Sequence, residues 1–389
     1  MPQLRDIIHI GVNALFLIPG EVGGSETYLC KTLDAICRRF PEIHMTVFSN
    51  MENHSMLSSM LSGYPRIEVS RLNFHATHRY VRILCEQTKL PLKARKAGIH
   101  VLWNPGYTAP IFASCPQVLS ILDMQYRRHP EDLTPIARIA TDLLIKRTQQ
   151  KVRQFITISR FSKSEIIRFT SIPQDKIHVT PLAVEDVDLN NKTRVELLEP
   201  VSKWLEPAVP YLLTVANSYP HKNIHTLVEA FERLENQIPH RLVIVGKPRL
   251  GEGRLIESLS KISDPKRVVR IYGLSRPALF SLYRCAALFV FPSLYEGFGL
   301  PILEAMISET PVVTTKMASI PEVGNNCVVY VDKPIPEAFV EKILQVLGWD
   351  PAYRSTFLVE AKKWAKTFSW EKTAEKTVEI LVRTAADNA

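Results

Sequence analysis

Short apolar runs alternate with segments of helical spacing along the whole chain. Runs rich in β-branched and aromatic residues predict buried strands, at 7–15, 45–49, 101–103, 118–122, 155–159 and from 177, then at 211–216, 241–246, 268–273, 287–291 and 311–315. Between them, 25–39 has one apolar face, and similar spacing predicts helices at 79–97, from 162, and at 224–236, 339–347, 353–366 and from 369. Strands that alternate with helices are typical of parallel sheets, so the fold class is α/β.

Length and composition predict two domains. The chain has 389 residues, of which 46% are hydrophobic and 22% are charged. It is therefore an ordinary globular chain that is too long for one compact core. The polar segment 185–194 and the proline-punctuated stretch up to 210 predict a linker. We expect one Rossmann-like domain over 1–190, a second over 205–369, and a last helix over 370–389.

The stretch 287–304 organises the second half. A buried strand ends at Pro292, and Gly297 and Gly299 then allow a sharp turn. Pro301 suits the start of a helix. In open α/β sheets ligands bind at the carboxyl ends of strands, and the free N–H groups of a helix start favour an anion. Glu296 and Glu304 flank this turn and could accept hydrogen bonds from sugar hydroxyls, which points to a nucleotide sugar.

Glu296 and Glu304, with seven residues between them that include Gly-Phe-Gly-Leu-Pro, resemble the E-x7-E signature of retaining glycosyltransferases of the GT4 type (glycosyltransferase group 1). The resemblance implies a GT-B fold, in which two Rossmann-like domains with parallel sheets face a central cleft. It implies that the C-terminal domain binds a nucleotide-sugar donor, that the N-terminal domain faces a glycan or lipid-linked acceptor, and that helix 370–389 packs back on the N-terminal domain. No metal and no other cofactor are expected.

The resemblance also assigns roles in this stretch. Glu296 is expected to orient the donor sugar and Glu304 to bind the ribose, while the loop and helix start hold the phosphates through Gly297, Phe298, Gly299 and Leu300. The alternative for the two glutamates is structural: one lies in a solvated loop, and the other is stabilised by the helix dipole.

The loop 217–223 contributes a candidate cation. Lys222 and Asn223 match the family's Lys-Asn pair, and Lys222 is expected to neutralise the donor diphosphate and to act in catalysis. Relatives often have an arginine shortly before this lysine. No arginine lies between Asn217 and His221, so these two residues are added as donor-binding candidates, together with Gly246 at the end of the next strand. A plain surface lysine is the alternative.

The first half offers two further candidates. Gly23 and Gly24 precede the first helix and resemble the family's glycine loop, which approaches the donor phosphate, although a plain turn explains them equally well. No G-x-G-x-x-G follows the first strand, which argues against an NAD enzyme. Asp123 follows a strand where the family usually has His-Asp, but Leu122 occupies the histidine position. Asp123 is a candidate for the donor sugar or acceptor, and the leucine suits a 6-deoxy sugar.

The basic segment 79–96 has three possible interpretations: a solvated face, a patch for anionic lipid or a nucleic-acid site. The net charge is +9, and 79–96 carries six basic residues against a single acid, Glu86. This segment is either a solvated face or a patch for anionic lipid. Nucleic acid is not expected as a partner, because no recognisable binding module accompanies the charge.

The six cysteines are scattered, and no run reaches the length of a membrane span, so we expect a cytoplasmic protein with peripheral contact at the inner membrane face.

Together these features predict a metal-independent hexosyltransferase that moves a sugar from a nucleoside diphosphate to a glycan or lipid-linked acceptor in polysaccharide biosynthesis, with retention at the anomeric carbon. The leaving phosphate would accept the acceptor's proton, while the protein orients the reactants and stabilises charge. The alternative is a nucleotide-sugar-binding homologue that has lost catalysis, which Leu122 motivates.

Overall fold

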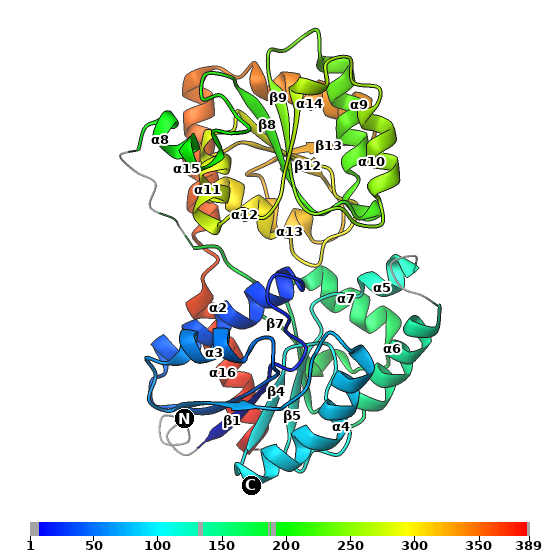
Figure 1. Ribbon diagram of the computed structural model, residues 1–389, viewed down its shortest axis with the longest axis vertical. Helices are drawn as coiled ribbons and strands as arrows, with labels where there is room; N and C mark the ends of the chain where they lie inside the picture. Colours follow the sequence, from blue (N-terminus) through cyan, green and yellow to red (C-terminus); the bar gives the residue numbers. More distant parts are fainter. Residues whose placement is uncertain (1–7, 131–134, 186, 188–191, 387–389) are drawn as a thin grey trace. The chain divides into compact units, whose positions relative to one another are not determined.

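The structure is a computed structural model that describes residues 8–130, 135–185, 187 and 192–386. The chain forms two compact units (Figure 1). Unit 1 consists of Met1–Leu182 and Ser369–Ala389, and unit 2 consists of Ala183–Phe368. Each unit is described by itself below.

The strands described in unit 1 form one parallel sheet of seven, in the order β3-β2-β1-β4-β5-β6-β7. Their bounds are β1 His9–Asn13, β2 His44–Ser49, β3 Ile67–Arg71, β4 Val101–Asn104, β5 Gln117–Ser120, β6 Gln154–Thr157 and β7 Ile177–Val179. The helices are α2 Gly24–Arg39, α3 His54–Leu61, α4 Arg79–Lys96, α5 Gln125–Arg128, α6 Pro135–Thr148, α7 Arg160–Phe169 and α16 Trp370–Ala386. Strand β1 is paired on both sides, so all its residues after His9 are buried.

The strands described in unit 2 form a second parallel sheet of six, in the order β10-β9-β8-β11-β12-β13. Their bounds are β8 Tyr211–Val215, β9 Arg241–Val245, β10 Val268–Ile271, β11 Leu288–Phe291, β12 Val312–Thr315 and β13 Val329–Val331. The helices are α8 Arg194–Leu198, α9 Ile224–Leu234, α10 Glu252–Leu259, α11 Arg276–Cys285, α12 Leu300–Ile307, α13 Ile320–Gly324, α14 Pro336–Leu347 and α15 Pro351–Ala365. The order of strands reverses between β8 and β11, where doubly wound sheets bind ligands.

The predicted α/β class with two parallel sheets is confirmed. The sequence pattern did not indicate the short edge strands β3 and β13 or the helices α3, α6, α10 and α11. The edge strands are only half buried, so they lack the continuous apolar run that marked the central strands.

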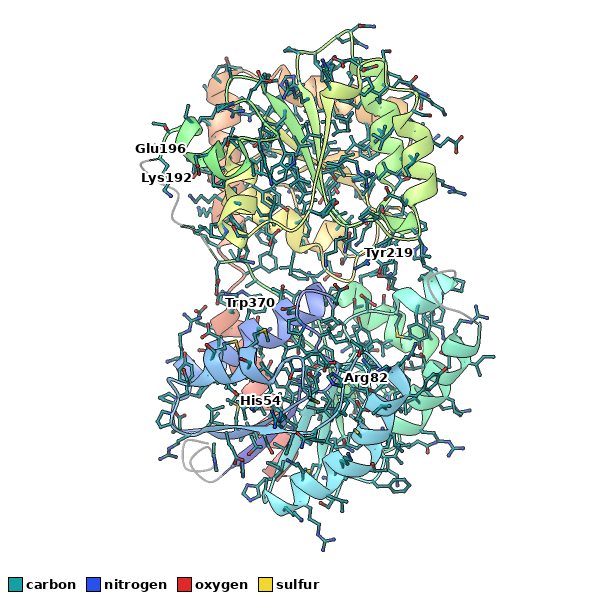
Figure 2. The ribbon with its side chains drawn as sticks, in the orientation of Figure 1. His54, Arg82, Lys192, Glu196, Tyr219 and Trp370 are labelled. Atoms are coloured by element: carbon teal, nitrogen blue, oxygen red, sulfur yellow. The ribbon has the colours of Figure 1, made fainter. Side chains whose placement is uncertain are left out.

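The linker predicted over 185–210 is wrong in its second part, because this part folds into unit 2. Thr193 and Glu196 form a capping box at the start of α8 (Figure 2 labels Glu196). Leu198 and Val201 are fully buried, and α8 packs against α11. The boundary between the units lies at 182/183, ahead of the expected 190. The polar capping residues resemble a linker in the sequence, although they start a short helix.

Helix α16 belongs to unit 1, although it follows unit 2 in the chain. It packs against α2 and the sheet strands β4, β5 and β6. Its buried face includes Ala374, Val378 and Leu381, each 0% exposed. The Thr373 hydroxyl donates a hydrogen bond of 2.5 Å to the carbonyl oxygen of Pro181. The two segments that connect unit 1 to unit 2 are therefore held together inside unit 1.

Candidate functional site in unit 2

A lysine and a glutamate meet where the strand order reverses. The Nζ atom of Lys222 lies 2.8 Å from Oε1 of Glu296, and the two side chains are 19% and 10% exposed. Lys222 ends the short 3-10 turn after β8, and Glu296 lies in the loop after β11. The two strands are neighbours in the sheet, so their carboxyl ends bring together residues that are 74 positions apart. Both residues thus lie at the carboxyl ends of neighbouring parallel strands, where open α/β sheets bind ligands.

The backbone fixes the distance between these two loops. The Leu294 N–H donates to the carbonyl oxygen of His221 at 2.8 Å, one residue before Lys222. The Ser319 hydroxyl lies 2.9 Å from the carbonyl oxygens of Glu296 and Phe298 and can donate to one of them at a time. Because loop backbone is bonded on both sides of Glu296, its carboxylate is held in a preorganised position.

Glu304 lies on the second turn of α12. Gly299, at φ 107, starts this helix in the left-handed region, which a side chain would disfavour. The Tyr283 hydroxyl donates to Glu304 Oε2 at 3.1 Å, and Arg276 Nη1 lies 3.9 Å from Oε1. Burial raises the pKa of the Glu304 carboxyl, and Arg276 and the tyrosine hydrogen bond oppose this effect. A carboxylate kept in such a place without a close ion pair is a candidate for ligand binding.

We predict that Glu304→Gln raises the stability of the protein and weakens its binding of nucleoside diphosphates. Since burial raises the pKa of Glu304, the folded chain holds this proton more tightly than the unfolded chain. The carboxylate therefore costs stability as the pH rises above the ordinary glutamate value of about 4.3. The Tm of the variant should exceed that of wild type at pH 8, and the gap should close near pH 4. Calorimetry should show roughly 10-fold to 100-fold weaker nucleoside-diphosphate binding.

The control for this prediction is Glu257→Gln, at an exposed position of α10. It should leave both the Tm profile and the affinity unchanged. Equal nucleotide affinity in wild type and Glu304→Gln would contradict the assignment to the nucleotide. A Tm gap that does not depend on pH would contradict the electrostatic explanation.

Two further donor-binding candidates, Gly246 and Asn217, shape the backbone of unit 2. A Cβ on Gly246, at φ 154, would lie 2.0 Å from the carbonyl oxygen of Ala216. Beside it, Asn217 Oδ1 accepts a hydrogen bond from the Lys247 N–H at 2.8 Å. Gly246 is thus required for the close approach of the loops after β8 and β9, and the Asn217 oxygen is used to hold this contact.

His221 and Asn223 are buried, at 1% and 4% exposed. The His221 ring stacks on Tyr219 with 5.6 Å between the ring centroids (Figure 2 labels Tyr219). Asn223 has φ 54, and its Oδ1 accepts from the Thr226 hydroxyl at 2.7 Å. The left-handed conformation that asparagine tolerates ends the turn and starts α9. Both side chains shape the loop that presents Lys222.

The rest of the loop after β11 is also largely buried. Phe298 is 4% exposed and packs edge to face on Phe368, at 5.8 Å between centroids. Gly297 is buried, and Leu300 begins α12 with its side chain partly exposed. What this segment offers to a ligand is therefore backbone N–H groups at the start of α12.

The candidates of unit 1 lie at its own strand and helix ends. Gly23 and Gly24 are exposed at the start of α2, and Gly23 has φ 54. Asp123 follows β5 and is partly exposed, and its Oδ1 accepts from the Gln125 N–H at 3.1 Å. Leu122 is 4% exposed, which favours a packing role at the end of its strand.

Three contacts of the site were not predicted from the sequence: Ser319 as a support of Glu296, and Arg276 and Tyr283 beside Glu304. The last two belong to α11, which the sequence pattern did not assign. The sequence signal that could have indicated the start of α11 is a serine N-cap followed by a proline in the first turn. In the structure the Ser275 hydroxyl accepts a hydrogen bond from the Ala278 N–H. Among the described residues no cluster of three or more His, Cys, Asp or Glu could hold a metal ion.

Sequence comparison places residues 209–348 in the family model "Glycosyl transferases group 1". The O-antigen chain mannosyltransferase B of Escherichia coli is 34% identical over 226 residues, which cover 57% of this chain and 58% of that protein. The MMP alpha-(1->4)-mannosyltransferase of Mycolicibacterium hassiacum is 28% identical over 250 residues, 62% of this chain and 56% of that protein. The chain thus matches less than two thirds of the length of these relatives.

Solved structures resemble nearly the whole chain. Sucrose-phosphate synthase from Thermosynechococcus elongatus has a TM-score of 0.77 at 17% identity, with 98% of this chain and 100% of that chain covered. Anabaena HepE in complex with UDP-glucose has a TM-score of 0.74 at 16% identity, with 96% and 99% covered. At these identities the likeness shows the fold, and the predicted GT-B class is confirmed. The family match itself extends over residues 209–348, within unit 2, which are similar to the glycosyltransferase group 1 domain.

Proposed function

We propose that the protein is a retaining hexosyltransferase that uses a nucleoside-diphosphate sugar, with mannose as the first candidate sugar. The observation that carries the proposal is the Lys222–Glu296 pair at the β8/β11 switch point, beside the start of α12 and eight residues before Glu304. The relatives named as mannosyltransferases support the choice of sugar. The structure of HepE with UDP-glucose supports a nucleotide-sugar donor.

Each residue of the site has a proposed role in binding the donor or orienting its sugar. Lys222 and the N–H groups at Gly299 hold the diphosphate, Glu304 accepts the ribose hydroxyls, and Glu296 orients the sugar. The bond from the anomeric carbon to the phosphate oxygen breaks, and a bond to the acceptor oxygen forms on the same face. The leaving diphosphate takes the acceptor's proton. Asp123, in unit 1, is the candidate for contact with the donor sugar or the acceptor.

Turnover of a panel of nucleotide sugars tests this proposal. GDP-mannose, UDP-glucose and their 6-deoxy counterparts are each supplied with a lipid-linked or glycan acceptor, with EDTA present. We expect transfer without added metal, and NMR should show that the product keeps the anomeric configuration of the donor. Binding of a donor without transfer to any acceptor would favour the catalytically impaired homologue, and inversion would exclude the retaining mechanism.

We also propose that α4 contacts anionic lipid. Several large apolar side chains of α4 and the neighbouring α6 are exposed, namely Tyr80 at 85%, Leu84 at 62%, Leu92 at 63%, Ile139 at 64% and Leu143 at 54%. Arg79 connects the helices through a hydrogen bond of 2.9 Å to the Thr141 hydroxyl. Apolar and basic side chains on one surface helix are typical of interfacial binding. No described helix has the length and hydropathy that a membrane-spanning segment needs.

Reversing exposed charges of α4 is expected to weaken vesicle binding. The triple variant Lys89→Glu, Arg95→Glu and Lys96→Glu changes the local charge by six units, and each basic residue near an anionic surface contributes about 1 kcal/mol. Sedimentation with phosphatidylglycerol vesicles at low salt should fall at least 10-fold.

The matched control reverses three exposed lysines of unit 2, Lys261, Lys266 and Lys363. This control should sediment like wild type. If it loses as much binding as the α4 variant, only the net charge of the protein matters. If neither variant differs from wild type, α4 is a solvated face.

A further inference from the structure

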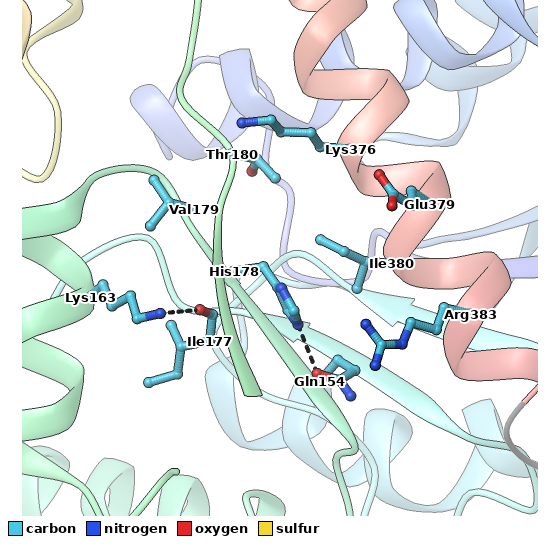
Figure 3. A pocket seen from close by; sticks show the side chains of 10 residues that line it. All are labelled: Gln154, Lys163, Ile177, His178, Val179, Thr180, Lys376, Glu379, Ile380 and Arg383. Carbon is cyan, nitrogen blue, oxygen red and sulfur yellow. Dashed lines mark hydrogen bonds between the residues drawn. The ribbon is translucent and has the colours of Figure 1, made fainter. Parts of the chain in front are cut away.

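A pocket lies in unit 1, and its lining contains no residue of the proposed donor site. It has a volume of about 380 Å³ and lies between the edge strand β7 and the helix α16 (Figure 3). Its lining consists of Gln154, Lys163, Ile177, His178, Val179, Thr180, Lys376, Glu379, Ile380 and Arg383. Strands β6 and β7 and helices α7 and α16 all contribute, so the pocket depends on the packing of α16 on this sheet.

Cations dominate this lining. Three permanent cations, Lys163, Lys376 and Arg383, face a single carboxylate, that of Glu379. Lys163 donates to the carbonyl oxygen of Ile177 at 2.7 Å, which covers the open edge of β7. Within the described part of the chain, the side chains of Lys376, Glu379 and Arg383 form no hydrogen bond or ion pair with one another or with other residues. Their helical spacing places these three exposed side chains on one face of α16, so a ligand can reach their charges from the solvent.

The pocket also has an apolar side and a hydrogen-bonding side. Ile177, Val179 and Ile380 supply apolar surface. His178 Nε2 lies 2.8 Å from Gln154 Oε1 (Figure 3). Burial lowers the pKa of His178, with further lowering by the charges of Lys163 and Arg383, while the carboxylates of Glu379 and Asp175 oppose this effect. An anion in the pocket would offset the effect of the two cations on the ring.

We propose that this pocket binds a small phosphate monoester with an apolar substituent. With His178 neutral, the ionised lining has a charge of +2, which matches the −1.5 to −2 of a phosphate monoester at pH 7. The guanidinium of Arg383 suits two phosphate oxygens, while Lys376 adds a point charge. The substituent of the ligand lies against Val179 and Ile380, because Ile177 is only 1% exposed. This proposal is independent of the proposed transfer reaction.

The pocket lies beside both segments that connect unit 1 to unit 2. Thr180, in the lining, lies directly before Pro181, and Lys376 lies one turn after Thr373, whose hydroxyl bonds to Pro181. The chain leaves unit 1 at 182/183 and returns at 368/369. A phosphate that bridges α16 and β7 therefore stabilises both connecting segments where they enter unit 1. Binding should therefore raise the Tm of the protein.

Phenyl phosphate, with inorganic phosphate beside it, is the probe for this site. Wild type should bind phenyl phosphate saturably and more tightly than inorganic phosphate in calorimetry, with a rise in Tm. The variant Lys376→Gln with Arg383→Ala should bind at least 10-fold more weakly. Arg147→Ala with Lys151→Gln is the control, because it removes the same charge from exposed positions of unit 1 outside the lining.

Two further measurements localise the binding. Lys222→Met should bind phenyl phosphate like wild type, which separates this pocket from the proposed donor site. In wild type, the NMR resonance of the His178 ring, assigned with His178→Gln, should report a higher pKa when phenyl phosphate is bound. An unchanged His178 resonance, equal binding by the pocket variant, or loss of binding in Lys222→Met would each overturn the proposal.

Discussion

Replacing Glu296 by alanine is expected to lower kcat by about 10²-fold to 10³-fold, the loss seen when one group that stabilises a transition state is removed. Donor affinity should change far less, because the nucleotide is assigned to Glu304. The side chain of Glu296 is 10% exposed and pairs with Lys222 at 2.8 Å, and the loop backbone around it is bonded to Ser319 and to the carbonyl oxygen of His221. In the proposed role, a carboxylate fixed in this way costs little reorganisation during the reaction. Single-turnover kinetics and calorimetry on the same samples measure the two effects separately.

Glu296→Gln refines the measurement. It keeps an oxygen that can accept from Lys222 and removes only the charge, so it should fold like wild type and still lose most of the turnover. Glu257→Gln, exposed on α10, is the control and should be fully active. A fall in donor affinity as large as the fall in kcat would mean that Glu296 contacts the nucleotide and not the sugar. Full activity of both Glu296 variants would show that Glu296 has no part in the site.

Lys222→Met is expected to weaken nucleoside-diphosphate binding by about 1.5–3 kcal/mol, the range for hydrogen bonds to charged groups. Within the described residues, the Lys222 ammonium donates one hydrogen bond to Glu296. An ammonium has three donors, so two remain for phosphate oxygens. Methionine keeps the aliphatic volume of the side chain and removes the charge. Affinities for UDP, GDP and TDP should fall together, because the lysine contacts no base in this assignment.

This variant also leaves the largely buried carboxylate of Glu296 without its partner, which costs stability by itself. The double variant Lys222→Met with Glu296→Gln removes that penalty. It should recover stability over the single variant and still bind the diphosphate weakly. Lys261→Met, at an exposed position of unit 2, is the charge control. If Lys222→Met binds all three nucleotides as tightly as wild type, Lys222 does not bind phosphate and is only a structural partner of Glu296.

The sequence by itself determined the α/β class, the two sheets and the turn around Glu296. These features follow from local physics. A central parallel strand is buried on both faces and must be apolar along its length, as β8 and β11 are. Gly299 and Pro301 indicate the start of a helix in the sequence. Glycine tolerates the left-handed conformation before the helix, and proline suits the first helical turn. Glu296 and Glu304 could be singled out because their spacing is a property of one continuous segment.

Only the tertiary structure decided which distant groups meet. Lys222 and Glu296 come together because β8 and β11 are neighbours, and Tyr283 reaches Glu304 from a helix that the sequence pattern did not assign. The burial of His221 likewise depends on loops that the sequence does not place. The pocket beside β7 exists because α16 returns to unit 1 after the whole of unit 2. Such contacts depend on strand order and helix packing, which long-range burial of apolar surface selects and which no local pattern records.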